Sequence, residues 1–139
     1  MPDYTAVFLP GLTMTSQAAG TITGGDPVEV AGSGTVQKTT VGPSAGLGSA
    51  KCIGVAGQDA VAGAKLTVIV DRVVHEGLAD GGITAGDQVM SSSTAGRQVK
   101  TVPVTSGSPV KADVDQARVI IGIALTTAID GATVRWMQK

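Results

Sequence analysis

Aromatic residues, cysteine and histidine are nearly absent from this chain of 139 residues. Aromatic side chains make up 2% of it, namely Tyr4, Phe8 and Trp136. The hydrophobic core must therefore be built from Val, Ile, Leu and Ala, which bury little area each. The single cysteine, Cys52, excludes an intrachain disulfide and is expected to be a small buried side chain in a strand. The single histidine, His75, leaves a zinc site without its usual partners, so we expect no metal and no cofactor.

Charge is scarce as well, and it is balanced. Charged residues make up 15% of the chain and the formal net charge is −1, so no basic stripe could neutralise a run of phosphates and we expect no nucleic-acid partner. The longest apolar run, Val119–Leu125, is too short to span a bilayer, so we expect no membrane partner. Asparagine is missing, which excludes N-glycosylation sequons. These features fit assembly in a reducing cytoplasm.

Glycine, in contrast, is abundant. Twenty glycines in 139 residues are about twice the usual share of about 7% and indicate many tight turns. Short β-branched segments lie between them, and the strands that we expect cover about residues 26–32, 34–41, 51–57, 65–74, 88–93, 97–104, 118–125 and 132–138. The segments Asp59–Ala64 and Thr126–Ile129 are compatible with short connecting helices or tight turns, and residues 105–117 with a polar loop. The pattern predicts an all-β fold.

The chain also repeats itself. The stretch Ile22–Val28, ITGGDPV, returns 61 residues later as Ile83–Val89, ITAGDQV. A second block, Ile53–Ala56, returns 68 residues later as Ile121–Ala124. Two collinear matches indicate an internal duplication in which the second copy has seven more residues in its middle loop.

This duplication predicts how the chain is organised. We expect an extended N-terminal arm, residues 1–20, followed by one β domain, residues 21–139. That domain would be a compact barrel or sandwich made of two repeats, about residues 21–78 and 79–139. Neither repeat is long enough to bury a sufficient core alone, so the two should pack together.

The recurring residues have backbone explanations. Asp26 and Asp87 each follow a glycine at the entry to a strand, where an aspartate can accept backbone N–H bonds in a turn. We expect them, and Asp80, to be turn residues rather than calcium ligands, because the spacing differs from calcium loops. Gly54 and Gly122 lie inside strands, where glycine permits a bulge or the close approach of a neighbouring strand.

Two fragments are compatible with an enzyme, but neither has the context that catalysis needs. Gly42–Gly46 reads G-x-S-x-G around Ser44, and Asp71 and His75 follow in the order of a hydrolase triad. That motif requires a strand-to-helix turn on a parallel sheet, whereas Ser44 lies in a loop of Pro and Gly. His75 and Glu76 lack the second histidine of a zinc-protease motif. We therefore expect no catalytic residues and no enzymatic activity.

The matched segments resemble those of tailed-bacteriophage capsid decoration (cement) proteins, a family of small β-rich phage head proteins. The resemblance rests on Gly25–Val28, Ile53–Ala56, Gly63–Val68 and Ile83–Val89. An N-terminal arm before a β-fold also resembles, loosely, the lambda-type head decoration protein. The resemblance implies a structural protein on the outer capsid surface of the virion, assembled in the host cytoplasm. It further implies the major capsid protein as partner and self-association as a homotrimer.

The N-terminal arm is the expected capsid-binding segment. Its side chains Tyr4, Val7, Phe8 and Leu9 lie outside the repeats, and an extended chain end can add to the edge of a partner's sheet. The arm could instead cover the protein's own core or a neighbour in the trimer. The alternative function is a virion-surface adhesin or glycan-binding β-module, for which Trp136 and Tyr4 would be the aromatic platforms.

Overall fold

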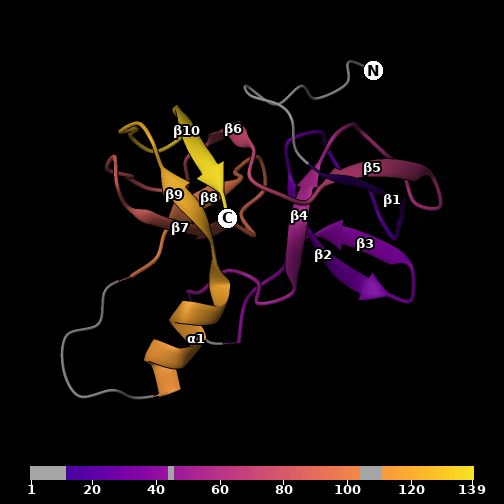
Figure 1. Ribbon diagram of the computed structural model, residues 1–139, viewed down its shortest axis with the longest axis horizontal. Coiled ribbons are helices and arrows are strands. Elements are labelled where there is room, and N and C mark those ends of the chain that lie inside the picture. The colour runs from indigo at the N-terminus through magenta and orange to yellow at the C-terminus, as the bar shows by residue number, and fades with distance from the viewer. Residues whose placement is uncertain (1–11, 44–45, 104–110) are drawn as a thin grey trace.

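The computed structural model describes residues 12–43, 46–103 and 111–139 and shows two β units side by side (Figure 1). The first barrel consists of β1 (Thr13–Ala18), β2 (Pro27–Gly32), β3 (Thr35–Lys38), β4 (Cys52–Ala56) and β5 (Lys65–Ile69), in the closed order β1-β3-β2-β4-β5. The second sheet consists of β6 (Val74–Leu78), β7 (Gln88–Ser91), β8 (Val99–Thr101), β9 (Ile120–Ala124) and β10 (Thr133–Gln138), in the order β6-β10-β9-β7-β8. The expected all-β class is confirmed.

The second sheet has the strand order of the first barrel. Apart from the β1–β3 pairing that closes the barrel, each neighbouring pair among β1 to β5 is repeated by the strands five places later, from β6 to β10. The parallel pairing of β1 with β3, which joins Ala18 to Val36, has its counterpart in the parallel bridge from Ala79 to Val99. Outside the named strands, the bridge between Ile22 and Ala60 is likewise repeated 61 and 68 residues later. The two repeats are therefore two copies of one fold.

Each repeat begins one strand earlier than the sequence match indicated. The residues expected to form an arm include β1, which pairs with β5 from Thr13 to Gln17. β1 was missed because its residues are small and polar, and only Ser16 and Ala18 point into the core. Its counterpart β6 falls at the end of the expected first repeat but belongs to the second sheet. The rest of the expected arm, residues 1–11, lies outside the described residues.

The helix lies where a polar loop was expected. α1 (Lys111–Val119) precedes β9, whereas the two segments compatible with short helices, Asp59–Ala64 and Thr126–Ile129, contain tight turns and single bridges. α1 has little apolar pattern to reveal it, since Asp115 and Val119, one turn apart, are the buried positions among its residues 114–119. Arg118 lies in the last turn, where its positive charge interacts favourably with the helix dipole. Across the described residues, no helix is long and apolar enough to cross a membrane.

Gly54 and Gly122 play the part that the sequence predicted. A Cβ atom on Gly54 would meet the carbonyl oxygen of Ile69 on β5, and one on Gly122 would meet that of Met137 on β10. In both repeats the register with the neighbouring strand also shifts beside the glycine, which marks a β-bulge. Close approach and bulge therefore occur together, at equivalent places.

Small aliphatic side chains build two main cores, one inside each unit. The first contains Ile22, Val28, Leu66 and Val68 among others, and the second is arranged around Trp136. Val55, on β4 of the first barrel, is a member of the second core. Further clusters lie elsewhere, one of them where the β3–β4 loop meets β7 and the end of α1. The two units are therefore packed against each other, as expected for two repeats that are each too small to bury a sufficient core alone.

Candidate functional site

The repeated Gly-Asp turns are built identically. Gly25 and Gly86 have φ angles of 92° and 94°, a region that favours glycine. Asp26 Oδ2 accepts the Thr23 N–H at 3.1 Å, and Asp87 Oδ2 accepts the N–H three residues before it at 2.9 Å. Both aspartates thus act as turn residues in the way that the sequence predicted.

The two equivalent aspartates differ in what surrounds them. Asp26 is buried, and its Oδ1 lies 2.9 Å from Lys38 Nζ and 3.2 Å from Gln98 Nε2 of the second repeat. Lys38 Nζ also donates to the Arg97 carbonyl at 3.1 Å. Asp87 accepts instead from the Thr101 hydroxyl at 2.9 Å. The aspartate of the first repeat is therefore part of a polar junction that links the units, which the sequence did not reveal.

Two residues of the hydrolase-like pattern, Asp71 and His75, lie within the described residues and make structural contacts. Ser44 lies outside the described residues, and Asp71 is half-buried beside Arg72, with 3.8 Å between Oδ1 and Nε. His75 is buried, with Nε2 at 2.9 Å from Gln138 Oε1 and its ring 5.0 Å from that of Trp136. Burial lowers the pKa of His75 below its ordinary value and outweighs the opposing hydrogen bond to Gln138. His75 thus packs in the core as a polar residue.

Asp80 is the third aspartate that the sequence placed in a turn. Asp80 Oδ2 accepts the hydroxyls of Ser92 at 2.6 Å and Thr94 at 2.9 Å, which tie down the β7–β8 loop. Within residues 12–43, 46–103 and 111–139, no group of three or more His, Cys, Asp or Glu side chains is placed to hold a metal ion.

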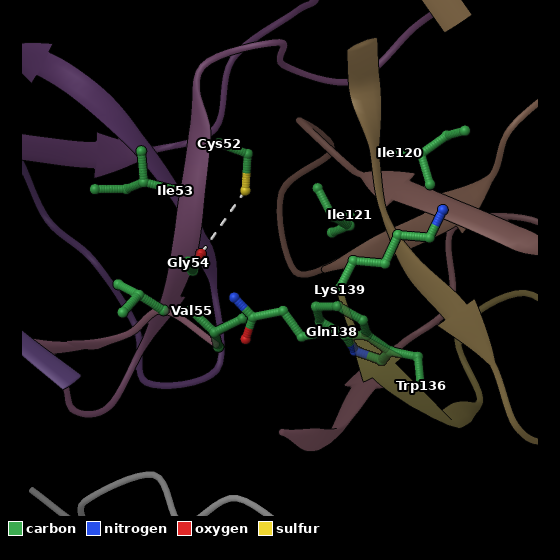
Figure 2. Close-up of a pocket in the computed structure, with 10 residues that line it drawn as sticks. Cys52, Ile53, Gly54, Val55, Ile120, Ile121, Trp136, Gln138 and Lys139 are labelled. Carbon is green, nitrogen blue, oxygen red and sulfur yellow. Dashed lines mark hydrogen bonds between the residues drawn. The ribbon is translucent and has the colours of Figure 1, made fainter. Parts of the chain in front are cut away.

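A cavity of about 120 Å³ lies between β4 of the first barrel and β9 and β10 of the second sheet (Figure 2). Cys52, Ile121 and Trp136 are among its lining residues. The Cys52 thiol donates to the Gly54 carbonyl at 3.7 Å, and burial raises the pKa of this thiol to about 12. The cavity is smaller than the 300 to 1,000 Å³ or so of typical ligand sites, and the thiol stays protonated near neutral pH.

A larger cavity, of about 300 Å³, lies over Glu29 between the β3–β4 loop and α1. Burial raises the pKa of Glu29, but hydrogen bonds from Ser49, Gln37 and Thr40 outweigh burial and bring it below its ordinary value. Arg118 lines the far side. Sequence reasoning missed this cavity because its residues are up to 89 positions apart. The polar groups of this loop donate hydrogen bonds to a buried carboxylate.

Of the residues expected in the arm or in a glycan-binding platform, Trp136 lies within the described residues. Tyr4, Val7, Phe8 and Leu9 lie outside the described residues. Trp136 is 1% exposed and packs in the second core, so it offers no surface on which a sugar could stack. Of the two aromatic residues that a glycan-binding module could have offered, Trp136 is therefore part of the core.

No protein-family model matches the chain, and no curated protein matches its sequence. Among solved structures the chain is similar to the crystal structure of the head fiber gp8.5 N base in bacteriophage phi29, with a TM-score of 0.57 and 14% identity. The match covers 92% of this chain and 93% of that one. At this identity the match shows a shared fold. The expected likeness to proteins of the bacteriophage head is confirmed at the level of the fold.

Proposed function

We propose that this chain is a structural protein of a bacteriophage head. In this proposal it decorates the outer surface of the shell of major capsid protein and stabilises the mature head, without catalysis. The observation that supports this most is the likeness to a phage head fiber base over nearly the whole of both chains, so that complete modules rather than fragments correspond.

The physical properties of the chain suit this role. A protein that binds only the mature shell stabilises that state by mass action, and many copies on one lattice add their weak contributions. Closed symmetry, here proposed as a homotrimer, lets one patch serve every subunit. A surface with few charges packs against a partner with little desolvation cost.

The N-terminal residues are the proposed shell-binding segment. Tyr4, Val7, Phe8 and Leu9 would add to a sheet edge of the major capsid protein through backbone hydrogen bonds, with alternate side chains giving the fit. Ordering such a segment costs about 1 kcal/mol or more per residue, which its contacts must exceed. The proposal extends only to residues 1–11, because Leu12 O already accepts the Val70 N–H at 2.8 Å in the barrel.

The test is cosedimentation of the purified chain with DNA-filled heads of the phage that encodes it. We expect saturable binding, and a higher temperature for DNA release from the decorated heads. Absence of saturable binding, or equal binding to heads of an unrelated phage, contradicts the decoration role. Binding to a glycan array with no binding to heads supports the adhesin instead.

A deletion of residues 1–11 tests the segment separately. It leaves β1 intact, so we expect an unchanged melting temperature together with loss of head binding. Four Ala substitutions at Tyr4, Val7, Phe8 and Leu9 are the matched variant of full length. Head binding retained at full strength in both would show that the shell contact lies elsewhere.

A further inference from the structure

Within one chain, the first barrel covers part of the second sheet with its β3–β4 loop, residues 39–51. The Ser49 N–H donates to Ser91 Oγ at 3.1 Å, and the Thr39 hydroxyl donates to the Ser92 carbonyl at 3.3 Å. As a result Ser91 and Ser92, at the end of β7, are both 0% exposed. This contact joins the loop of one repeat to the strand end of the next.

The same place on the first barrel is uncovered. Val30, Ala31 and Gly32 form the end of β2, and Val30 and Ala31 correspond to Ser91 and Ser92 by the repeat of 61 residues. All three are exposed, and Val30 has 45% of its surface accessible. Where the buried end of β7 carries serines, this exposed strand end is apolar. We call Val30–Gly32 the β2 end.

The counterpart of the covering loop in the second repeat contains α1. Asp115 and Val119 face inward, while Val114, Ala117 and Arg118 are exposed on the other side of the helix, with Val114 at 61%. Counted back from β9 by the repeat of 68 residues, Ala117 stands where Ser49 stands in the first repeat. Within one chain α1 lies beside Glu29, earlier in β2, where Arg118 lines the same cavity, but it leaves the β2 end exposed.

We propose that the β2 end of one copy docks against the exposed α1 face (Val114, Ala117 and Arg118) of a second copy. This contact would continue, between copies, the contact that already joins the two repeats within the chain. Because the two patches differ, the contact is head-to-tail, and it closes into a ring when the rotation between copies allows. It deepens the proposed homotrimer, in which three copies present six repeats, and it does not depend on shell binding.

The first test substitutes each patch separately and measures self-association of the full chain by analytical ultracentrifugation. Val30→Asp and Val114→Asp should each weaken association at least about tenfold, since each replaces an apolar side chain of the contact by a carboxylate that loses its hydration there. Val61→Asp is the matched control, because Val61 is 62% exposed on the β4–β5 turn, away from both patches. Melting temperatures establish that all three variants are folded.

The second test mixes the two patch variants in equal amounts. A head-to-tail contact leaves one sound β2 end and one sound α1 face in the mixture, so dimers should form although neither variant associates alone. A mixture that stays monomeric overturns the proposal, and so does Val30→Asp associating like the parent chain. A parent chain that is monomeric at its highest soluble concentration also overturns it, while leaving head binding unaffected. Loss of head binding by Val30→Asp with unchanged self-association assigns the β2 end to the shell instead and overturns the contact between copies.

Discussion

In the first barrel, β1 pairs with β3 at two consecutive positions and the strand order closes on itself. In the second sheet, the corresponding strands β6 and β8 share one parallel bridge among the described residues, from Ala79 to Val99. The Gln98 side chain substitutes for a ladder bond there, since its Oε1 accepts the Leu78 N–H at 2.6 Å. In the first barrel the matching N–H, of Gln17, reaches the backbone carbonyl of Gly34. The β7–β8 hairpin has seven residues between its strands and the β2–β3 hairpin has two, so the looser closure accompanies a longer hairpin in an unchanged topology.

The two cores compensate for this difference. Val68 fills the first barrel, whereas Trp136 stands at the equivalent position of the second sheet and is buried to the same degree. A larger side chain occupies the space that an open sheet leaves, and Val55 from the first barrel completes the same core. A duplicated fold can therefore lose barrel closure in one copy when that copy has a larger core side chain, here Trp136, and receives a core residue from the other copy, here Val55.

The largest effect should come from shortening these two core residues. Trp136→Ala should lower the free energy of unfolding by about 3 to 5 kcal/mol, since it leaves a large cavity. Val68→Ala should cost less, about 1.5 to 3 kcal/mol. Val61→Ala, at an exposed site, should stay within about 0.5 kcal/mol. Urea denaturation followed by circular dichroism measures all three, and equal costs at Trp136 and Val68 would refute the compensation.

Substitution of the equivalent strand glycines Gly54 and Gly122 should destabilise the protein by similar amounts, because the two repeats share this close approach of strands. Gly54→Ala and Gly122→Ala should each cost about 1 to 3 kcal/mol, because the new Cβ meets backbone of the paired strand. Gly20→Ala is the control, since a Cβ there has nothing within 4 Å. Thermal unfolding by calorimetry gives the measurement. If either strand variant melts like the Gly20 variant, the close approach at that glycine is not required.

Substitution of the aspartates in the two Gly-Asp turns should lower the free energy of unfolding by different amounts in the two repeats, and the difference should be smaller than that for the core residues. Asp26→Asn removes a buried charge that faces Lys38 and should cost about 2 kcal/mol, because the ammonium group then lacks its partner. Asp87→Asn should cost about 1 kcal/mol, since the Thr101 hydroxyl can still donate to the amide oxygen. The double variant Asp26→Asn with Lys38→Met tests the pairing, and should recover part of the loss in the same urea titration. No recovery would show that Lys38 contributes independently.

Much of the fold followed from the sequence, because Ile22 and Ile83 each directly precede a turn whose backbone demands glycine and aspartate. β1 and β6 escaped detection, since a strand held by its ladder bonds can have little apolar alternation: β1 is rich in Thr, Ser and Gln, and β6 buries His75 and Gly77. α1 escaped because, among its residues 114–119, Asp115 and Val119 are the buried positions. Sequence predicts the elements that a local pattern encodes.

The candidate surfaces could not be predicted in the same way. Val30 and Ser91 have equivalent positions and opposite exposure, which depends on the neighbouring repeat rather than on either residue. The junction of Asp26, Lys38 and Gln98 likewise joins residues from both repeats. Such features depend on how the two repeats pack against each other, and the residue pattern within one repeat does not predict that packing.

The smallest expected effect concerns pH and one position where the repeats differ in chemistry. His75 is the only histidine, and the equivalent residue of β1 is Met14, which does not titrate. Burial lowers the pKa of His75 in the fold, so the unfolded chain binds a proton more readily below about pH 6.5. The contribution of His75 to stability is therefore complete above that pH and falls as pH decreases, by at most about 1.4 kcal/mol per pH unit. Lowered carboxyl pKa values, such as that of Glu29, act at more acidic pH. Urea titrations between about pH 7 and 5 should show this slope in the parent chain and its loss in His75→Gln. An equal slope in both chains would mean that the unfolded and folded states bind the His75 proton alike.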